Sequence, residues 1–113
     1  YRIHAKAAKA GFTWDDDEDA EKQVEAEWLE LLDAKAEGDP AHIEHELGDM
    51  IFSLVELGRR MGVKANIAAD LTCNRFVARF EAMEALARER NLDFENMSLD
   101  DKDELWNEVK EKE

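Results

Sequence analysis

The chain contains little proline, glycine or cysteine: among 113 residues there are one proline, five glycines and one cysteine. Alternating stretches of β-branched residues, which are typical of strands, are also absent. Cys73 has no second cysteine with which to form a disulfide, and it shares no zinc-ligand spacing with the three histidines. These absences argue against strands, disulfides and a zinc site. They favour helices throughout and suit a reducing cytoplasm.

Positive charge and long apolar segments are scarce as well. Acidic residues outnumber basic ones by 29 to 15, and the formal net charge is -14 at pH 7. Such a chain repels phosphate backbones, so we expect no nucleic-acid partner. The longest apolar run, residues 50–55, is far shorter than the roughly 20 residues that span a bilayer. We expect a soluble, cytoplasmic protein with no membrane contact, and the start at Tyr1 suits a piece of a longer chain.

The few glycines and the proline mark the ends of the predicted helices. Gly38 and Gly62 end two of them, while Asp39 and Pro40 are typical of an N-cap and the first residue of a helix. The predicted helices cover residues 3–10, 19–36, 40–61, 66–90 and 98–110. No linker or low-complexity segment separates them. The sequence therefore predicts an all-α fold, a bundle of about five helices forming a single domain over residues 1–113.

Two consecutive predicted helices each carry a pair of carboxylates three residues apart. Glu27 and Glu30 lie along one edge of an apolar stripe, and Glu46 and Asp49 lie along the edge of the next stripe. We expect the stripes themselves to be buried; they comprise Val24, Trp28, Leu31, Leu32, Ile43, Leu47, Met50, Ile51, Leu54, Gly58 and Met61. Antiparallel packing of the two helices would bring the pairs together into one four-carboxylate cluster.

Four carboxylates in a partly buried seam repel one another with an energy on the order of several kcal/mol, so protons or cations must neutralise them. Oxygen ligands favour Mg²⁺, with Mn²⁺ as a substitute, over zinc. Mg²⁺ also binds substrate phosphates and lowers the pKa of a bound water. The cluster therefore indicates metal-assisted hydrolysis of a phosphoanhydride. The alternative is an acidic helical bundle without a metal, in which such pairs arise by chance on solvated faces.

The carboxylate pairs resemble the signature of the MazG family. Glu27-x-x-Glu30 and Glu46-Leu-Gly-Asp49, separated by residues 31–45, are similar to the family's Glu-x-x-Glu and Glu-x-x-Asp motifs. Residues 6–14 resemble the segment that leads into the second domain of tandem MazG proteins. Further matches cover nearly the whole chain and include Arg75-Phe76, Arg79-Phe80, Trp106 and Lys110.

The resemblance implies an all-α enzyme, dimeric or of higher order, that hydrolyses nucleoside triphosphates to nucleoside monophosphate and pyrophosphate with Mg²⁺. It implies that the four carboxylates are catalytic and bind the metal, namely Glu27, Glu30, Glu46 and Asp49. It also implies a substrate-binding set in which three cations neutralise the phosphates and an indole packs near the nucleotide: Arg75, Arg79, Lys110 and Trp106.

Two positions depart from the family pattern. The family often has a glutamate just before each motif, where this chain has Ala26 and His45. Ala26 has no group that binds a metal. His45 is either a ligand or proton carrier, or a solvated residue, and the same alternatives hold for His42. These departures motivate a second hypothesis, a catalytically weak or inactive MazG-fold domain with a regulatory or assembly role.

Overall fold

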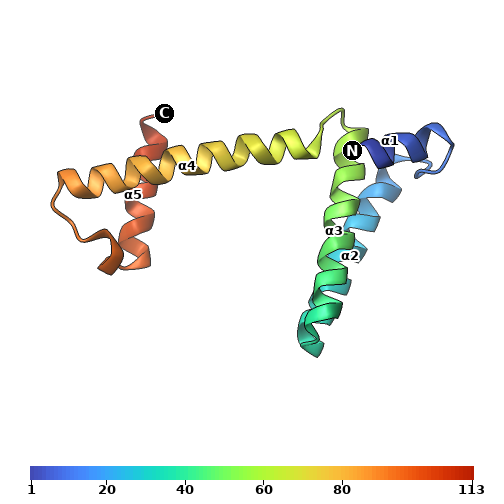
Figure 1. Cartoon of the computed structure of the whole chain (residues 1–113), viewed down its shortest axis with the longest axis horizontal. Helices are drawn as coiled ribbons and strands as arrows, with labels where there is room; N and C mark the ends of the chain where they lie inside the picture. Colours follow the sequence, from blue (N-terminus) through green and yellow to red (C-terminus); the bar gives the residue numbers. More distant parts are fainter. The chain divides into compact units, whose positions relative to one another are not determined.

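The computed structural model describes residues 1–113 and contains five α-helices and no strand. The helices are α1 (Arg2–Lys9), α2 (Asp17–Glu37), α3 (Pro40–Arg60), α4 (Ala65–Glu89) and α5 (Leu99–Glu111), with a 3₁₀ turn at Phe94–Asn96 (Figure 1). The predicted all-α class with five helices is confirmed. The chain forms two compact units, Tyr1–Ala68 and Ala69–Glu113, and its expected organisation as a single domain stays a prediction.

None of the helices combines the length and the apolar composition needed to cross a bilayer.

The ends of α2 and α3 follow the local signals in the sequence. The Asp16 side chain accepts a hydrogen bond of 2.8 Å from the backbone N–H of Asp19, so α2 begins two residues earlier than predicted. The Asp39 side chain accepts one of 3.1 Å from the N–H of Ala41, with Pro40 at the first helical position, as predicted. These side chains accept hydrogen bonds from backbone N–H groups that have no partner within the helix.

The first unit is organised around α2 and α3, which lie side by side (Figure 1). The chain reverses direction at Gly38, which ends α2 in the left-handed conformation with φ of 78°. A residue without a Cβ adopts this conformation at little cost. α1 packs on α3, where the rings of His4 and Phe52 have centroids 3.9 Å apart. The short turn therefore fixes which faces of α2 and α3 meet.

The faces that meet carry the predicted carboxylates, whereas the predicted apolar stripes are only partly covered. Glu27 on α2 and Glu46 on α3 are buried, whereas Leu47, Ile51 and Leu54 of the predicted buried stripe stay 47%, 54% and 45% exposed. The prediction of a buried stripe is therefore wrong for these three residues, although Gly58 of the same stripe is buried. The carboxylate edge faces the neighbouring helix instead. The stripe on α3 lies roughly a quarter of a turn away from it, since successive residues are about 100° apart around a helix.

The second unit has its own small core. Buried side chains of α4 and α5 meet there, with partly buried side chains around them; the set comprises Met83, Ala87, Leu105, Val109, Leu86, Phe94, Met97 and Trp106. Ser98 caps α5, because its Oγ accepts a hydrogen bond of 3.1 Å from the N–H of Asp101. This is the helix start that the sequence predicts at residue 98.

Two glycine substitutions test how the turn fixes the hairpin. Gly38→Ala should lower the free energy of unfolding by about 1 kcal/mol, because alanine is strained at positive φ although an added Cβ meets no atom there. Gly48→Ala is the matched control: its Cβ also meets no atom, its φ is not positive, and the helical alanine should add about 0.5–1 kcal/mol. Denaturant unfolding measures both, and equal effects of the same sign would contradict this account.

Candidate functional site

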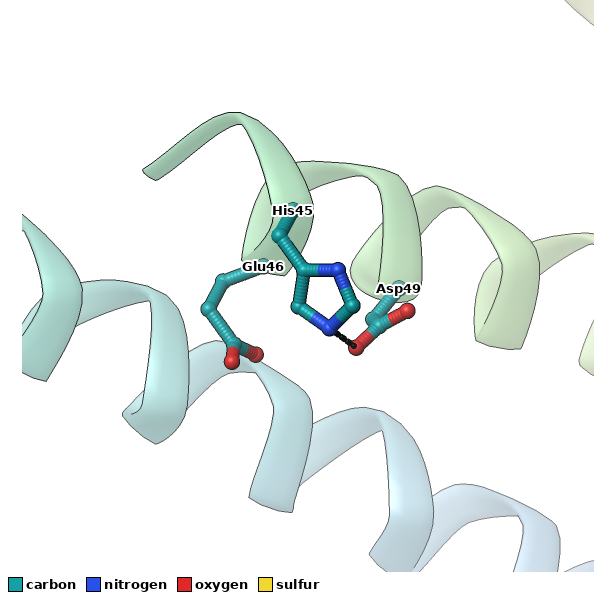
Figure 2. Close-up of side chains that lie close together, drawn as sticks. All are labelled: His45, Glu46 and Asp49. Atoms are coloured by element: carbon teal, nitrogen blue, oxygen red, sulfur yellow. Dashed lines mark ion pairs between the residues drawn. The ribbon is translucent and has the colours of Figure 1, made fainter. Parts of the chain in front are cut away.

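The four predicted carboxylates come together in the seam between α2 and α3. Glu27 and Glu46 are each 8% exposed, Asp49 is partly buried and Glu30 is exposed. One ligand atom each from Glu27, Glu30 and Glu46 lies within 4.8 Å of the others, and the same holds for His45, Glu46 and Asp49. Figure 2 shows Glu46 extending from α3 toward α2, with His45 beside Asp49. Glu46 is thus shared by two overlapping groups of potential metal ligands.

The hydrogen bonds of the two buried carboxylates are incomplete. Gln23 Nε2 donates to Glu27 Oε1 at 2.6 Å, and His42 Nε2 lies 3.2 Å from Glu46 Oε1. The other oxygens, Glu27 Oε2 and Glu46 Oε2, are buried without a hydrogen-bond partner. A buried carboxylate oxygen left unpaired is costly, and a cation would compensate for it. The set consists of carboxylate oxygens with two adjacent imidazoles, those of His42 and His45, and carboxylate oxygens suit a hard divalent cation such as Mg²⁺.

The pKa of Glu27 reflects the repulsion between the carboxylates of this arrangement. Burial raises the pKa of Glu27 and the hydrogen bond from Gln23 lowers it, while the nearby charges of Glu30 and Asp49 raise it further, so the pKa lies above its usual value. The folded chain then binds this proton more tightly than the unfolded chain does. Without a cation, Glu27 therefore contributes stability below its unfolded-state pKa, and this contribution is lost as the pH rises through the raised folded-state pKa.

Both histidines whose roles the sequence left open touch the cluster. The ring of His42 lies between two carboxylates, with Nδ1 2.8 Å from Glu37 Oε2 and Nε2 3.2 Å from Glu46 Oε1. The hydrogen bond to Glu37 is the main cause of the raised pKa of His42. His45 Nε2 lies 3.3 Å from Asp49 Oδ2. Each histidine stands four residues before its carboxylate, the spacing that places two side chains on one helix face.

A cavity of about 530 Å³ opens beside the cluster, within residues 1–68. Glu27 and Asp49 form part of its wall, so it is continuous with the carboxylates. Three aromatic side chains from α3 and the segment before α2 also line it, namely Phe12, Trp14 and Phe52. Its size falls within the range of about 300–1,000 Å³ that is common for small-molecule sites.

The segment before α2 is attached to α3 by a network that sequence reasoning missed. Arg60 donates from Nη1 to the backbone oxygen of Trp14 at 2.8 Å and from Nε to Asp17 Oδ1 at 2.8 Å. Thr13 Oγ1 donates to Glu56 Oε2 at 2.9 Å. This network holds one wall of the cavity in place. The partners lie far apart in the sequence, so no local pattern signals them.

The four predicted substrate-binding residues lie in the second unit, Ala69–Glu113. Arg79 donates two hydrogen bonds to the Glu113 carboxylate, at 2.7 and 2.9 Å, and its guanidinium lies 5.4 Å from the centre of the Trp106 ring. These hydrogen bonds are the main reason that the pKa of Glu113 is lowered, and the charges of Lys110 and Arg75 lower it further. The structure thus gathers the three predicted cations around one carboxylate, with Trp106 packed against Arg79.

Comparison with known proteins gives two kinds of result. No protein-family model matches the chain. Among curated proteins, the chain is 37% identical over 109 residues to the nucleoside triphosphate pyrophosphohydrolase/pyrophosphatase MazG of Thermotoga maritima. It is 32% identical over 114 residues to the nucleoside triphosphate pyrophosphohydrolase of Escherichia coli K12.

These alignments cover 96% and 99% of the chain but 42% and 43% of the two relatives, so the chain spans about two-fifths of their length. The uncharacterized protein YabN of Bacillus subtilis is 38% identical over 72 residues, which are 64% of this chain and 15% of that protein. The resemblance predicted from the carboxylate motifs is therefore confirmed: over nearly its whole length, the chain is similar to part of proteins named MazG or nucleoside triphosphate pyrophosphohydrolase.

Proposed function

We propose that this chain hydrolyses nucleoside triphosphates, ribo- or deoxyribo-, to nucleoside monophosphate and pyrophosphate with Mg²⁺ held in the α2–α3 seam. The observation that carries the proposal is the pair of buried carboxylate oxygens, on Glu27 and Glu46, that have no hydrogen-bond partner. The names of the relatives supply the reaction, since two of them are nucleoside triphosphate pyrophosphohydrolases.

Glu27, Glu30, Glu46 and Asp49 would hold the cation, and Mn²⁺ would substitute for Mg²⁺. When bound, Mg²⁺ neutralises the charge of the triphosphate and lowers the pKa of the attacking water. The water oxygen attacks the α or the β phosphorus, and the anhydride bond between these two phosphates breaks. Attack on the α phosphorus releases pyrophosphate with the electron pair of that bond, whereas attack on the β phosphorus releases the nucleoside monophosphate with it.

Asp49 is the residue best suited to take the proton from the water. It lines the cavity, and its Oδ2 lies 3.3 Å from Nε2 of the exposed His45. A proton accepted by the carboxylate passes through the imidazole to bulk solvent. In this role His45 takes over proton transfer, in the position where the family often has a glutamate.

The cationic group of the second unit is proposed to bind the phosphates. Arg79 already holds a carboxylate through two parallel hydrogen bonds, which is also how a guanidinium holds a phosphate. Arg75 and Lys110 would add positive charge around the same anion. Trp106, whose ring packs against the Arg79 guanidinium, would lie against the nucleotide.

The chain is further proposed to form a homodimer or a higher homo-oligomer. The support is the set of large apolar side chains that α2 and α3 leave exposed, namely Trp28, Leu29, Leu32, Leu47, Ile51 and Leu54. Apolar side chains exposed together on neighbouring helices often mark an interface, and such a set suits a two-fold interface.

Glu46→Gln tests the metal site, because it keeps the shape of the side chain but removes the charge shared by both ligand groups. Turnover of nucleoside triphosphates should fall by at least about 100-fold, since even residues behind metal ligands are typically worth 10- to 100-fold. The wild-type chain should gain about 2.7 kcal/mol of stability at a Mg²⁺ concentration a hundred times its Kd, and the variant should lose that gain.

Glu44→Gln is the matched control, since Glu44 is an exposed glutamate on the same helix. It should leave turnover and the Mg²⁺ effect unchanged. A wild-type chain that binds Mg²⁺ without turnover would instead support the inactive, regulatory hypothesis. A chain that Mg²⁺ does not stabilise at all would support the metal-free acidic bundle.

Ile51→Glu tests the proposed association. A charge placed within the exposed apolar set should shift the wild-type dimer toward monomer by at least about tenfold in dissociation constant. Light scattering over a concentration series measures the change. A wild-type chain that is monomeric at all concentrations would contradict the proposal.

A further inference from the structure

The cavity beside the carboxylates presents flat apolar surfaces together with a few buried polar groups. Phe12 and Trp14 are exposed and Phe52 is half exposed, so their rings are available to a ligand in the cavity. A nucleobase is planar and stacks on such rings whatever its identity. Since Glu27 and Asp49 belong to the same wall, a nucleotide whose phosphates lie at the carboxylates has its base within reach of the cavity.

One buried polar side chain of the cavity, Glu56, has hydrogen-bonding capacity that the fold leaves unused. His4 also lines the cavity, but both nitrogens of its ring are buried and it serves there as part of the wall. Glu56 is 7% exposed; it accepts from Thr13 at 2.9 Å and from Arg59 Nε at 2.6 Å. Each carboxylate oxygen has two lone pairs, so each still accepts another hydrogen bond.

The charge states of these groups follow from their surroundings. Burial raises the pKa of Glu56, but the hydrogen bonds from Arg59 and Thr13 outweigh burial and the net pKa lies below its usual value. Burial is the main cause of the lowered pKa of His4. At neutral pH the cavity therefore offers an ionised carboxylate, which only accepts hydrogen bonds.

Among the four common bases, one pairs best with a carboxylate. Guanine presents two adjacent donors, N1–H and the N2 amino group, on its Watson–Crick edge, with the acceptor O6 next to them. Adenine and cytosine each present one amino group beside an acceptor nitrogen, which an ionised carboxylate repels. Uracil presents a single N–H between two carbonyl oxygens. Leaving a buried polar group unpaired is the usual source of strong discrimination.

We infer that this cavity binds the base of the substrate and that Glu56 selects guanine. Glu56 accepts from N1–H and from the N2 amino group. Phe12, Trp14 and Phe52 provide the stacking surface. The inference rests on the proposed function, because the phosphates are placed at the neighbouring carboxylates, and it names the substrate class of that site.

Glu56→Gln tests the inference through the ratio of kcat/KM for GTP to that for ATP. The wild-type chain should favour GTP by at least about tenfold. In the variant the ratio should fall by about tenfold, because an amide offers one acceptor and one donor and so matches the edge of adenine better than that of guanine. A ratio near one in the wild-type chain, or a ratio that the variant leaves unchanged, would overturn the inference.

Two control variants separate base recognition from effects on the fold. Thr13→Ala removes the hydrogen bond between the segment before α2 and Glu56 but keeps the carboxylate, so it should change GTP and ATP turnover by similar factors. Glu44→Gln, exposed on the same helix, should change neither. If Thr13→Ala shifts the ratio as much as Glu56→Gln does, selectivity comes from loop order and not from the carboxylate.

Nucleoside binding to the wild-type protein, measured by calorimetry without metal, is a test that depends neither on turnover nor on the folding of the variants. Wild-type protein should bind guanosine at least about tenfold more tightly than inosine, which lacks the N2 amino group, and more tightly than adenosine. Such binding without any triphosphate hydrolysis would uphold the guanine site and refute the proposed reaction. Hydrolysis of all triphosphates without this preference would refute the guanine site and uphold the reaction.

Discussion

Burying Glu27 and Glu46 between α2 and α3 costs free energy that the neighbouring side chains offset only in part. Gln23 and His42 each satisfy one carboxylate oxygen, and a second oxygen on each glutamate stays without a partner. A helical hairpin that needed only stability would place leucines in this seam. The hairpin therefore gives up stability so that four carboxylates meet, and the proposed divalent cation would resolve the repulsion. The proposed reaction depends on this constraint.

The same hairpin supports a second wall of the site. Arg60 and Glu56, both near the end of α3, bind Thr13 and Trp14 in the segment before α2 and Asp17 at its first residue. This attachment forms the cavity that opens next to the carboxylates. The proposed metal site and the proposed base site would thereby share the first unit, which suits sites that must hold reacting groups in fixed geometry.

Local chemistry explains which parts of the fold the sequence predicted. Asp39 with Pro40, Gly38 and Ser98 act within a few residues of themselves, and the helix ends that they predict are present. The carboxylate pairs were predictable for the same reason, because residues three apart share a helix face. Their meeting across the seam followed from the short turn.

Predictions that required knowing the neighbour of a helix were less successful. Periodicity shows that α3 has an apolar face, but it does not show whether α2 or another chain covers that face, and Leu47, Ile51 and Leu54 stay exposed. Thr13, Glu56 and Arg60 were missed because each contacts a partner far along the chain. Arg75, Arg79 and Lys110 came from family resemblance alone, since basic residues in an acidic chain also form ordinary ion pairs.

The most direct test of the central claim is the identity of the products. Each common nucleoside triphosphate is incubated with the purified chain, with Mg²⁺ and with EDTA, and the products are separated by anion-exchange chromatography. The proposed function predicts nucleoside monophosphate and pyrophosphate in equal amounts, formed only when Mg²⁺ is present. Nucleoside diphosphate and phosphate as products, or hydrolysis that continues in EDTA, would contradict it.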